Sequence, residues 1–469
     1  MKRLFYIVIV AMVTPLLGGC GLGTGSSAPP PPWAATVTSL PYSPDQGATA
    51  GDGRVKLEWT PTAGVDYWVF AATNPALTAF NWTGLANAQA VIAAPMPTYM
   101  CGLIDNLPYY FATNGRINGG PGGASSPTIT ATPYNASANW QLNGTNFSSD
   151  IYGLGYTGLT TCANNTALSA AGMFAAVGAT GGIFTSLDGM NWTKQTTPAG
   201  FIANLNAITG YAINQNNATT PGLRWVAVGD GGKALYSTDG INWSVAASTA
   251  TSENLRSIVQ VGGSFFAVGD GGTIISSGDG NTWSLAAPVT SYRLNGIAHA
   301  GFYVAVGDHG TIVTNGGGGW GLPTSPTTSN LHQVTAIATI YGSIYVAVGD
   351  SGTIVTSDSY LHNGVWTALT LGTNPLVGVA VEPRGVETTT AYTTAPAIDL
   401  WLGFISSAQF VAIDSTGKTY TSVNGYDWTA SATSTGISCT TGTTCMNPLV
   451  SSGFGYVTVG NSGVYATAF

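Results

Sequence analysis

The chain has 469 residues, of which 7% are charged, whereas about a quarter are charged in an average soluble domain. It contains 64 glycines and 44% hydrophobic residues, and its formal net charge is −8. These values argue against a helical bundle, which needs abundant Ala, Glu, Lys and Leu, and against a nucleic-acid binder, which needs a basic surface. They also argue against a disordered chain, which is poor in hydrophobic residues. We therefore expect an all-β protein with neutral polar surfaces.

Residues 1–19 have the pattern of an export signal. Lys2 and Arg3 precede an apolar run over residues 4–17, which is too short for a comfortable membrane span. The run ends in Leu-Gly-Gly-Cys at 17–20, which resembles the lipobox of bacterial lipoproteins. That resemblance implies cleavage before Cys20 and a diacylglycerol on its thiol; an ordinary signal peptide with a chance cysteine is the alternative. Gly21, in place of Asp, favours the outer membrane or cell surface as the location.

Residues 20–32 end in four prolines and predict a tether that holds the remaining chain away from the membrane. Residues 33–133 follow as short alternating segments with turn signals between them. Trp59 ends one such segment, and Leu103 precedes Tyr109 by six residues. This spacing resembles a fibronectin type III domain with its tyrosine corner. The resemblance implies a β-sandwich that serves as a spacer.

A phrase of the form aromatic-Val-Ala-Val-Gly-Asp recurs seven times in residues 134–469. The residues that end the seven copies are Gly178, Gly229, Gly269, Gly307, Gly349, Asp414 and Gly460, at separations of 38 to 65 residues. Such periods are typical of four-stranded propeller blades. The last copy ends before its fourth strand, and residues 134–143 resemble the missing piece. We therefore predict a seven-bladed propeller closed by the strand at 134–143, with six or eight blades as open alternatives.

A tight turn of the form Ser-x-Asp-Gly-x-x-Trp follows the phrase in several copies. It contains Asp188, Asp239 and Asp279, and Asn424 stands in the Asp position of a fourth copy. The turn resembles the Asp-box of sialidases and of photosystem assembly-factor-like propellers, with one residue fewer between Asp and Gly than the sialidase form. An Asp side chain accepts backbone N–H groups within such a turn, and Gly permits positive φ. We interpret these four residues as structural.

A second set of carboxylates recurs between the second and third strands of four successive blades. Its members are Asp230, Asp270, Asp308 and Asp350. One interpretation is that Asp-Gly simply suits a hairpin turn. The other is an acidic arc that binds a ligand, either a cation or a basic partner protein.

The cysteines suit an oxidising compartment. Cys439 and Cys445 lie six residues apart in one loop and are predicted to form a disulfide. Cys101 and Cys162 are both expected near the junction of sandwich and propeller, and we predict that they form a second disulfide.

The sequence predicts no catalytic residue, metal site or cofactor, because the four histidines lack metal-ligand spacing and no nucleophile motif is present. A sialidase needs three convergent arginines, and the propeller region offers only Arg224, Arg256, Arg293 and Arg384, at opposite ends of their blades. We therefore expect a monomeric, lipid-anchored binding or scaffold protein of the cell envelope that recognises a protein or glycan, not nucleic acid. The alternative function is a sialidase-like glycosidase acting on surface glycans.

Overall fold

The computed structural model describes residues 27–28, 47–51, 53–91, 94, 98–101, 103–117, 122–134, 136, 140–144, 147–157, 172–213, 222–316, 318–339, 342–358, 364–383, 408–437, 448–452, 455–460 and 464–468. Its regular structure consists of β-strands and short 3-10 turns. No helix in the described ranges is long and apolar enough to cross a membrane. The predicted signal segment and Cys20 lie outside these ranges.

The chain divides into two compact units, and the first comprises residues 1–32, 59–94 and 110–128. Its sheet follows the order β1–β7–β4–β5. These strands are β1 (Ser27–Ala28), β7 (Tyr109–Ile117), β4 (Val65–Ala72) and β5 (Gln89–Val91), and the 3-10 turn η1 covers Trp82–Gly84. Phe70 of β4 is buried and contacts the Trp82 ring at a centroid distance of 5.7 Å. The aromatic and small apolar residues of β4 therefore supply the core of this unit.

The second unit comprises residues 33–58, 95–109 and 129–469. It contains a three-stranded sheet in the order β2–β3–β6, with β2 (Gly47–Gly51), β3 (Arg54–Glu58) and β6 (Thr98–Cys101), and the short strand β8 (Ile129–Ala131). The hydroxyl of Tyr109 accepts a hydrogen bond from the backbone N–H of Ile104 at 3.2 Å. Arg54 of β3 also forms a buried ion pair with Glu382 at 3.0 Å.

Seven four-stranded antiparallel sheets, here numbered blades 1 to 7, make up the rest of the second unit. Blade 1 holds β10 (Ile151–Tyr156), β11 (Phe174–Gly178), β12 (Ile183–Ser186) and β13 (Thr193–Lys194). Blade 2 holds β14 (Leu205–Ile213), β15 (Gly222–Gly229), β16 (Ala234–Ser237) and β17 (Ser244–Val245). Blade 3 holds β18 (Leu255–Val261), β19 (Ser264–Gly269), β20 (Ile274–Ser277) and β21 (Ser284–Leu285). Blade 4 holds β22 (Leu294–His299), β23 (Tyr303–Gly307), β24 (Ile312–Asn315) and β25 (Trp320–Gly321).

The last three blades follow the same scheme. Blade 5 holds β26 (Leu331–Thr339), β27 (Gly342–Gly349), β28 (Thr353–Asp358) and β29 (Thr367–Thr370). Blade 6 holds β30 (Leu376–Pro383), β31 (Ala408–Asp414), β32 (Lys418–Ser422) and β33 (Thr429–Ser434). Blade 7 holds β34 (Leu449–Ser451), β35 (Tyr456–Val459), β36 (Tyr465–Ala468) and, as its fourth strand, β9 (Gln141–Asn143).

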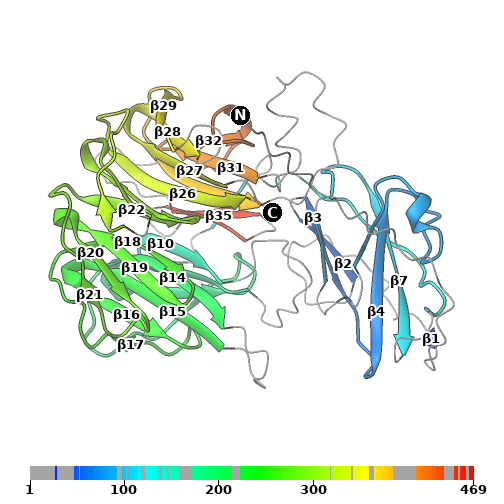
Figure 1. The fold of residues 1–469 in the computed structure, drawn as a ribbon. Helices are drawn as coiled ribbons and strands as arrows, with labels where there is room; N and C mark the ends of the chain where they lie inside the picture. Colours follow the sequence, from blue (N-terminus) through cyan, green and yellow to red (C-terminus); the bar gives the residue numbers. More distant parts are fainter. Residues whose placement is uncertain are drawn as a thin grey trace, which may run out of the picture. The chain divides into compact units, whose positions relative to one another are not determined.

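The blades close into a ring (Figure 1). The first strand of each blade contacts the first strand of the next, and β34 of blade 7 contacts β10 of blade 1. A Cβ atom added to Gly153 would lie 2.7 Å from the Cα of Ala207, so the first strands approach too closely there for a larger side chain. Since β9 precedes blade 1 in sequence but pairs with β36, both ends of this region meet in one sheet, and β9 covers the outer edge of β36. The fold is a seven-bladed β-propeller.

The repeated phrase forms the second strand of each blade, which is covered on both faces. In blade 2, Trp225 and Ala227 pack against Val177 of blade 1, whereas Val226 and Val228 belong to the cluster with blade 3. A strand buried on both faces requires a continuous apolar run and not an alternating one. Burial of each large apolar side chain contributes about 1.5–3 kcal/mol, so this strand is the main hydrophobic element of the blade.

Candidate functional site

The Asp-box aspartates are acceptors within their own turns. In blade 2, Oδ1 of Asp239 accepts the backbone N–H groups of Ile241 at 2.8 Å and Asn242 at 2.7 Å, and its Oδ2 accepts Nδ2 of Asn242 at 2.7 Å. Gly240 has φ +76° and its carbonyl accepts the indole N–H of Trp243 at 3.1 Å. Burial acts to raise the pKa of the Asp239 carboxyl, but these hydrogen bonds outweigh it and lower the pKa to about 2. Asp188, Asp279 and Asn424 make the equivalent backbone contacts.

The other four aspartates lie in 3-10 turns at the opposite end of the second strands. These turns are η4 (Asp230–Gly232), η5 (Asp270–Gly272), η6 (Asp308–Gly310) and η7 (Asp350–Gly352), and η3 (Ala179–Gly181) is their counterpart in blade 1. In each of the four, the backbone N–H of the Asp donates to the carbonyl of the residue that precedes the first strand of its blade. This contact brings the Asp side chain next to the residues on either side of the buried leucine that begins the first strand.

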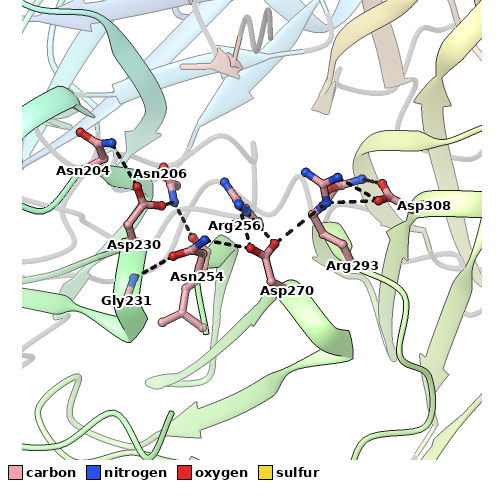
Figure 2. Close-up of polar contacts among 11 residues, drawn as sticks. Asn204, Asn206, Asp230, Gly231, Asn254, Arg256, Asp270, Arg293 and Asp308 are labelled. Carbon is pink, nitrogen blue, oxygen red and sulfur yellow. Dashed lines mark hydrogen bonds and ion pairs between the residues drawn. The ribbon is translucent and has the colours of Figure 1, made fainter. Parts of the chain in front are cut away.

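Those flanking residues are hydrogen-bond donors. In blade 2, Asn204 and Asn206 donate to the two oxygens of Asp230 at 3.0 and 2.9 Å. In blade 3, Asn254 donates to Oδ2 of Asp270 at 2.9 Å, and Arg256 bonds both oxygens through Nε and Nη2 at 2.9 and 2.8 Å. Figure 2 shows these contacts as a continuous row across neighbouring blades.

Blades 4 and 5 repeat the arrangement with other donors. Arg293 pairs with Asp308 at 3.0 Å, and Asn295 donates to the same carboxylate at 2.9 Å. In blade 5, Asn330 donates to Asp350 at 2.9 Å, and Nε2 of His332 lies 2.7 Å from its Oδ1. We call these four carboxylates with their flanking donors the polar belt. Its members are Asn204, Asn206, Asp230, Asn254, Arg256, Asp270, Arg293, Asn295, Asp308, Asn330, His332 and Asp350.

The polar belt also joins each blade to the next. The side-chain oxygen of Asn254 accepts the backbone N–H of Gly231 in the preceding turn at 2.8 Å, and Asn330 accepts that of His309 at 2.9 Å. In the other direction, Nδ2 of Asn206 donates to the carbonyl of Leu255 in the following blade at 2.9 Å. Arg293 makes an ionic cross-blade contact instead, since its Nε lies 4.0 Å from Asp270.

Within the polar belt, Asp270 and Asp308 are paired with arginines, whereas Asp230 is bonded by two neutral asparagines. Burial acts to raise the pKa of the Asp270 carboxyl, but hydrogen bonds from Arg256 and Asn254 and the charge of Arg293 hold it below its ordinary value. The bond to Asp270 raises the pKa of the Arg256 guanidinium. Among the residues that the structure describes, Nη1 of Arg256 and Nη1 of Arg293 have no hydrogen-bond partner. The belt therefore offers a ligand N–H donors, although its most frequent charged residue is Asp.

The sequence prediction singled out the four aspartates but not their donors. The signal was present, because a polar residue precedes the first-strand leucine in Asn204-Leu, Asn254-Leu, Arg293-Leu and Asn330-Leu. The role of this polar residue can be recognised only when its partner is known, which is the Asp of a turn up to 26 residues away.

The remaining site predictions lie elsewhere. Arg224 donates to the carbonyl of Asp279 in an Asp-box turn, at the opposite end of the second strand from the polar belt. Cys101 lies in β6, and its side chain is outside the described part. Of the residues singled out from the sequence, those that lie wholly outside the described ranges are Cys20, Cys162, Arg384, Cys439 and Cys445. Within the described ranges, no group of three His, Cys, Asp or Glu side chains could hold a metal ion.

The comparisons with known proteins concern the fold. No family model matches the chain, and no curated protein matches it significantly. Among solved structures, it is similar to YCF48 bound to D1 peptide, at 16% identity and TM-score 0.49, over 70% of this chain and 94% of that one. It is similar to the WD40 β-propeller domain of Doa1, at 11% identity and TM-score 0.44, over 70% and 96%. It is also similar to virginiamycin B lyase from Staphylococcus aureus, at 11% identity and TM-score 0.48, over 70% and 98%. Since these propellers have unrelated roles, we take no function from them.

Proposed function

We propose that the chain is a lipid-anchored protein of the cell envelope whose propeller is a non-catalytic binding head for a protein or glycan. The observation that carries this proposal is the polar belt, in which each carboxylate is already bonded by its own blade. Such side chains are held in place before a ligand arrives, which reduces the entropy lost on binding. A general acid at neutral pH needs a raised pKa, whereas that of Asp270 is lowered.

The hydrogen bonds of the polar belt change the role that the acidic-arc hypothesis gives to the aspartates. Asp230, Asp270, Asp308 and Asp350 are proposed to act on a ligand indirectly, by orienting Arg256, Arg293 and His332. An Arg guanidinium held by one carboxylate keeps outward N–H groups that suit a second acceptor. The ligand is thus expected to present hydrogen-bond acceptors to this face.

The N-terminal segments supply the anchor and the spacer of the proposal. The lipobox-like residues 17–20 support acylation of Cys20, and residues 20–32 support a tether. The strand orders β2–β3–β6 and β7–β4–β5, with the Tyr109 hydroxyl bond, are those expected of a fibronectin type III sandwich. The disulfides Cys101–Cys162 and Cys439–Cys445 remain part of the proposal.

A direct test uses substitutions that the repeat itself supplies. Asn206 and Asn295 occupy the positions of Arg256 and His332 in neighbouring blades, so Arg256→Asn with His332→Asn should keep the fold. We expect saturable binding of the full-length chain to isolated envelope, weakened about tenfold by this double substitution and unchanged by Lys233→Gln, which alters an exposed neighbouring cation. Equal binding by the double variant would refute the role of the belt.

The anchor and the glycosidase alternative need separate measurements. Labelled palmitate should be incorporated into the wild-type chain and not into Cys20→Ser. Release of fluorophore from 4-methylumbelliferyl sialosides or glycosides would favour the glycosidase. The position of Arg224 at the other end of its blade argues against a triad with Arg256 and Arg293.

A further inference from the structure

Blade 4 differs from its neighbours at three positions that lie together at one end of the blade. Two residues before the first-strand leucine, blades 2, 3, 4 and 5 carry Ala203, Glu253, Tyr292 and Ser329. One residue before it, they carry Asn204, Asn254, Arg293 and Asn330. At the second residue of the 3-10 turn, they carry Gly231, Gly271, His309 and Ser351. At these three positions, blade 4 alone among the four has two aromatic rings and a guanidinium.

These three side chains are exposed, and the rings of two of them are in contact. The rings of Tyr292 and His309 are stacked, with centroids 4.5 Å apart and planes 27° from parallel. Tyr292 is 47% exposed. The Arg293 side chain is 45% exposed, and its guanidinium is held by Asp308 at 3.0 Å. Figure 2 shows Arg293 between Asp270 and Asp308.

The local turn does not require a tyrosine at position 292. The backbone N–H of Tyr292 donates to the hydroxyl of Thr290 at 3.1 Å, and the equivalent N–H groups of Glu253 and Ser329 make the same bond at 3.1 Å. The turn therefore forms equally well with Glu or Ser in the place of Tyr292. The tyrosine ring adds exposed apolar surface without a backbone role.

His309 and Arg293 each lack a property that glycine or asparagine supplies at the same position in a neighbouring blade. His309 has φ +56°, in the left-handed region that favours glycine; Gly231 and Gly271 occupy the same position at φ +62°, and Ser351 occupies it at φ +56°. Arg293 cannot accept a hydrogen bond, so it does not provide the acceptor that Asn254 and Asn330 give to the preceding turn. Backbone strain of the kind seen at His309 clusters at functional sites.

We propose that Tyr292, Arg293 and His309 form a subsite for an acidic saccharide. The stacked rings provide an amphipathic face for the C–H face of a pyranose, and Nη1 of Arg293 donates to its carboxylate. The hydroxyls of Thr290 and the exposed Ser291 lie beside Tyr292 in sequence and suit sugar hydroxyls. This inference rests on the proposed binding function and names the class of ligand. An acidic peptide could pair with Arg293 but would make less use of the ring stack.

The test substitutes residues that neighbouring blades already carry at these positions. The triple variant Tyr292→Ser, Arg293→Asn, His309→Gly should fold like the wild type, and its thermal midpoint verifies this. The full-length chain in detergent is titrated calorimetrically with hexagalacturonate, a hyaluronan hexasaccharide and sialyllactose, and with maltohexaose and hexaglutamate as neutral and peptidic controls. We expect at least one acidic saccharide to bind, at least tenfold more tightly than both controls. The triple variant should lose at least tenfold in affinity for it, whereas Tyr292→Phe should retain binding.

Three results would overturn the inference. They are failure of all three acidic saccharides to bind, equal affinity of the triple variant, and equal binding of hexaglutamate, which would indicate an acidic peptide. If envelope binding still depends on Arg256 and His332 in any of these cases, the binding function stands and only the ligand class is wrong. If envelope binding is also absent, the proposed function itself fails.

Discussion

In the Asp-box turn of blade 2, the carboxylate and the amide of one hydrogen-bonded pair can be exchanged by a double substitution. In this turn Asp239 accepts from the Asn242 amide, whereas in blade 6 the amide of Asn424 donates to Asp427 at 2.8 Å. In both turns Oδ1 of the first residue accepts two backbone N–H groups. The double substitution Asp239→Asn, Asn242→Asp therefore converts one natural arrangement into the other.

The magnitudes follow from the bonds that each variant keeps. Asp239→Ala removes the acceptor of two backbone N–H groups, one amide and the Ser237 hydroxyl, and because the turn is partly exposed we expect a loss of about 2 kcal/mol. Asp239→Asn keeps the backbone bonds, but the new amide donor faces the amide donor of Asn242 without an acceptor between them. This costs about 1 kcal/mol. The double exchange should return to within about 0.5 kcal/mol of the wild type.

The same turn gives a pH dependence. The folded pKa of Asp239 is about 2, below its ordinary value of 3.8. A lowered folded pKa means that the stabilisation is present above the unfolded pKa and is lost as the pH falls from about 4 towards 2. After a discount for solvent screening, the wild type should lose about 1 kcal/mol more than Asp239→Asn between pH 5 and pH 2.

Differential scanning calorimetry of the propeller transition measures these effects. With an unfolding entropy of about 2.1 cal/mol/K per residue over roughly 330 residues, a loss of 2 kcal/mol lowers the midpoint by about 3 °C. The order of midpoints should be wild type, double exchange, Asp239→Asn, Asp239→Ala. A double exchange less stable than Asp239→Asn would refute the reasoning, because the amide and carboxylate would then not be interchangeable.

Three further predictions concern other turns, and thermal unfolding checks each. Gly232→Ala should lower the free energy of unfolding by more than about 2 kcal/mol, because its Cβ would lie 2.1 Å from the carbonyl oxygen of Thr251. Gly231→Ala has open space around its Cβ and should lower it by about 1 kcal/mol. Asn254→Ala should cost about 1–2 kcal/mol, because it removes one cross-blade acceptor and one donor to the polar belt. Tyr109→Phe should cost about 1 kcal/mol by removing the acceptor of the Ile104 N–H. A Gly231 variant as unstable as Gly232→Ala, or no effect of the other two, would contradict these assignments.

The sequence by itself determined the elements of the fold that depend on neighbours in the chain. The repeated phrase ending at Gly229 marks one blade of the repeat, and the Asp-box turns join strands that pair locally. These contacts span few residues, so the pattern that encodes them is visible in one repeat. Self-comparison extended this to seven repeats and to a closing strand within residues 134–143, where β9 pairs with Tyr465–Ala468.

Only the tertiary structure decided which polar side chains meet. Asn206 and Asp230 are 24 residues apart and become partners because the end of the second strand returns to the start of the first. Arg54 and Glu382 are 328 residues apart, and nothing in their local sequence relates them. Tyr292 and His309 are unremarkable in the sequence, and become a stacked pair only because two turns of blade 4 lie at the same end. Hydrophobic periodicity is a property of each strand, whereas the pairing of charges and rings depends on the loops that the closed ring brings together.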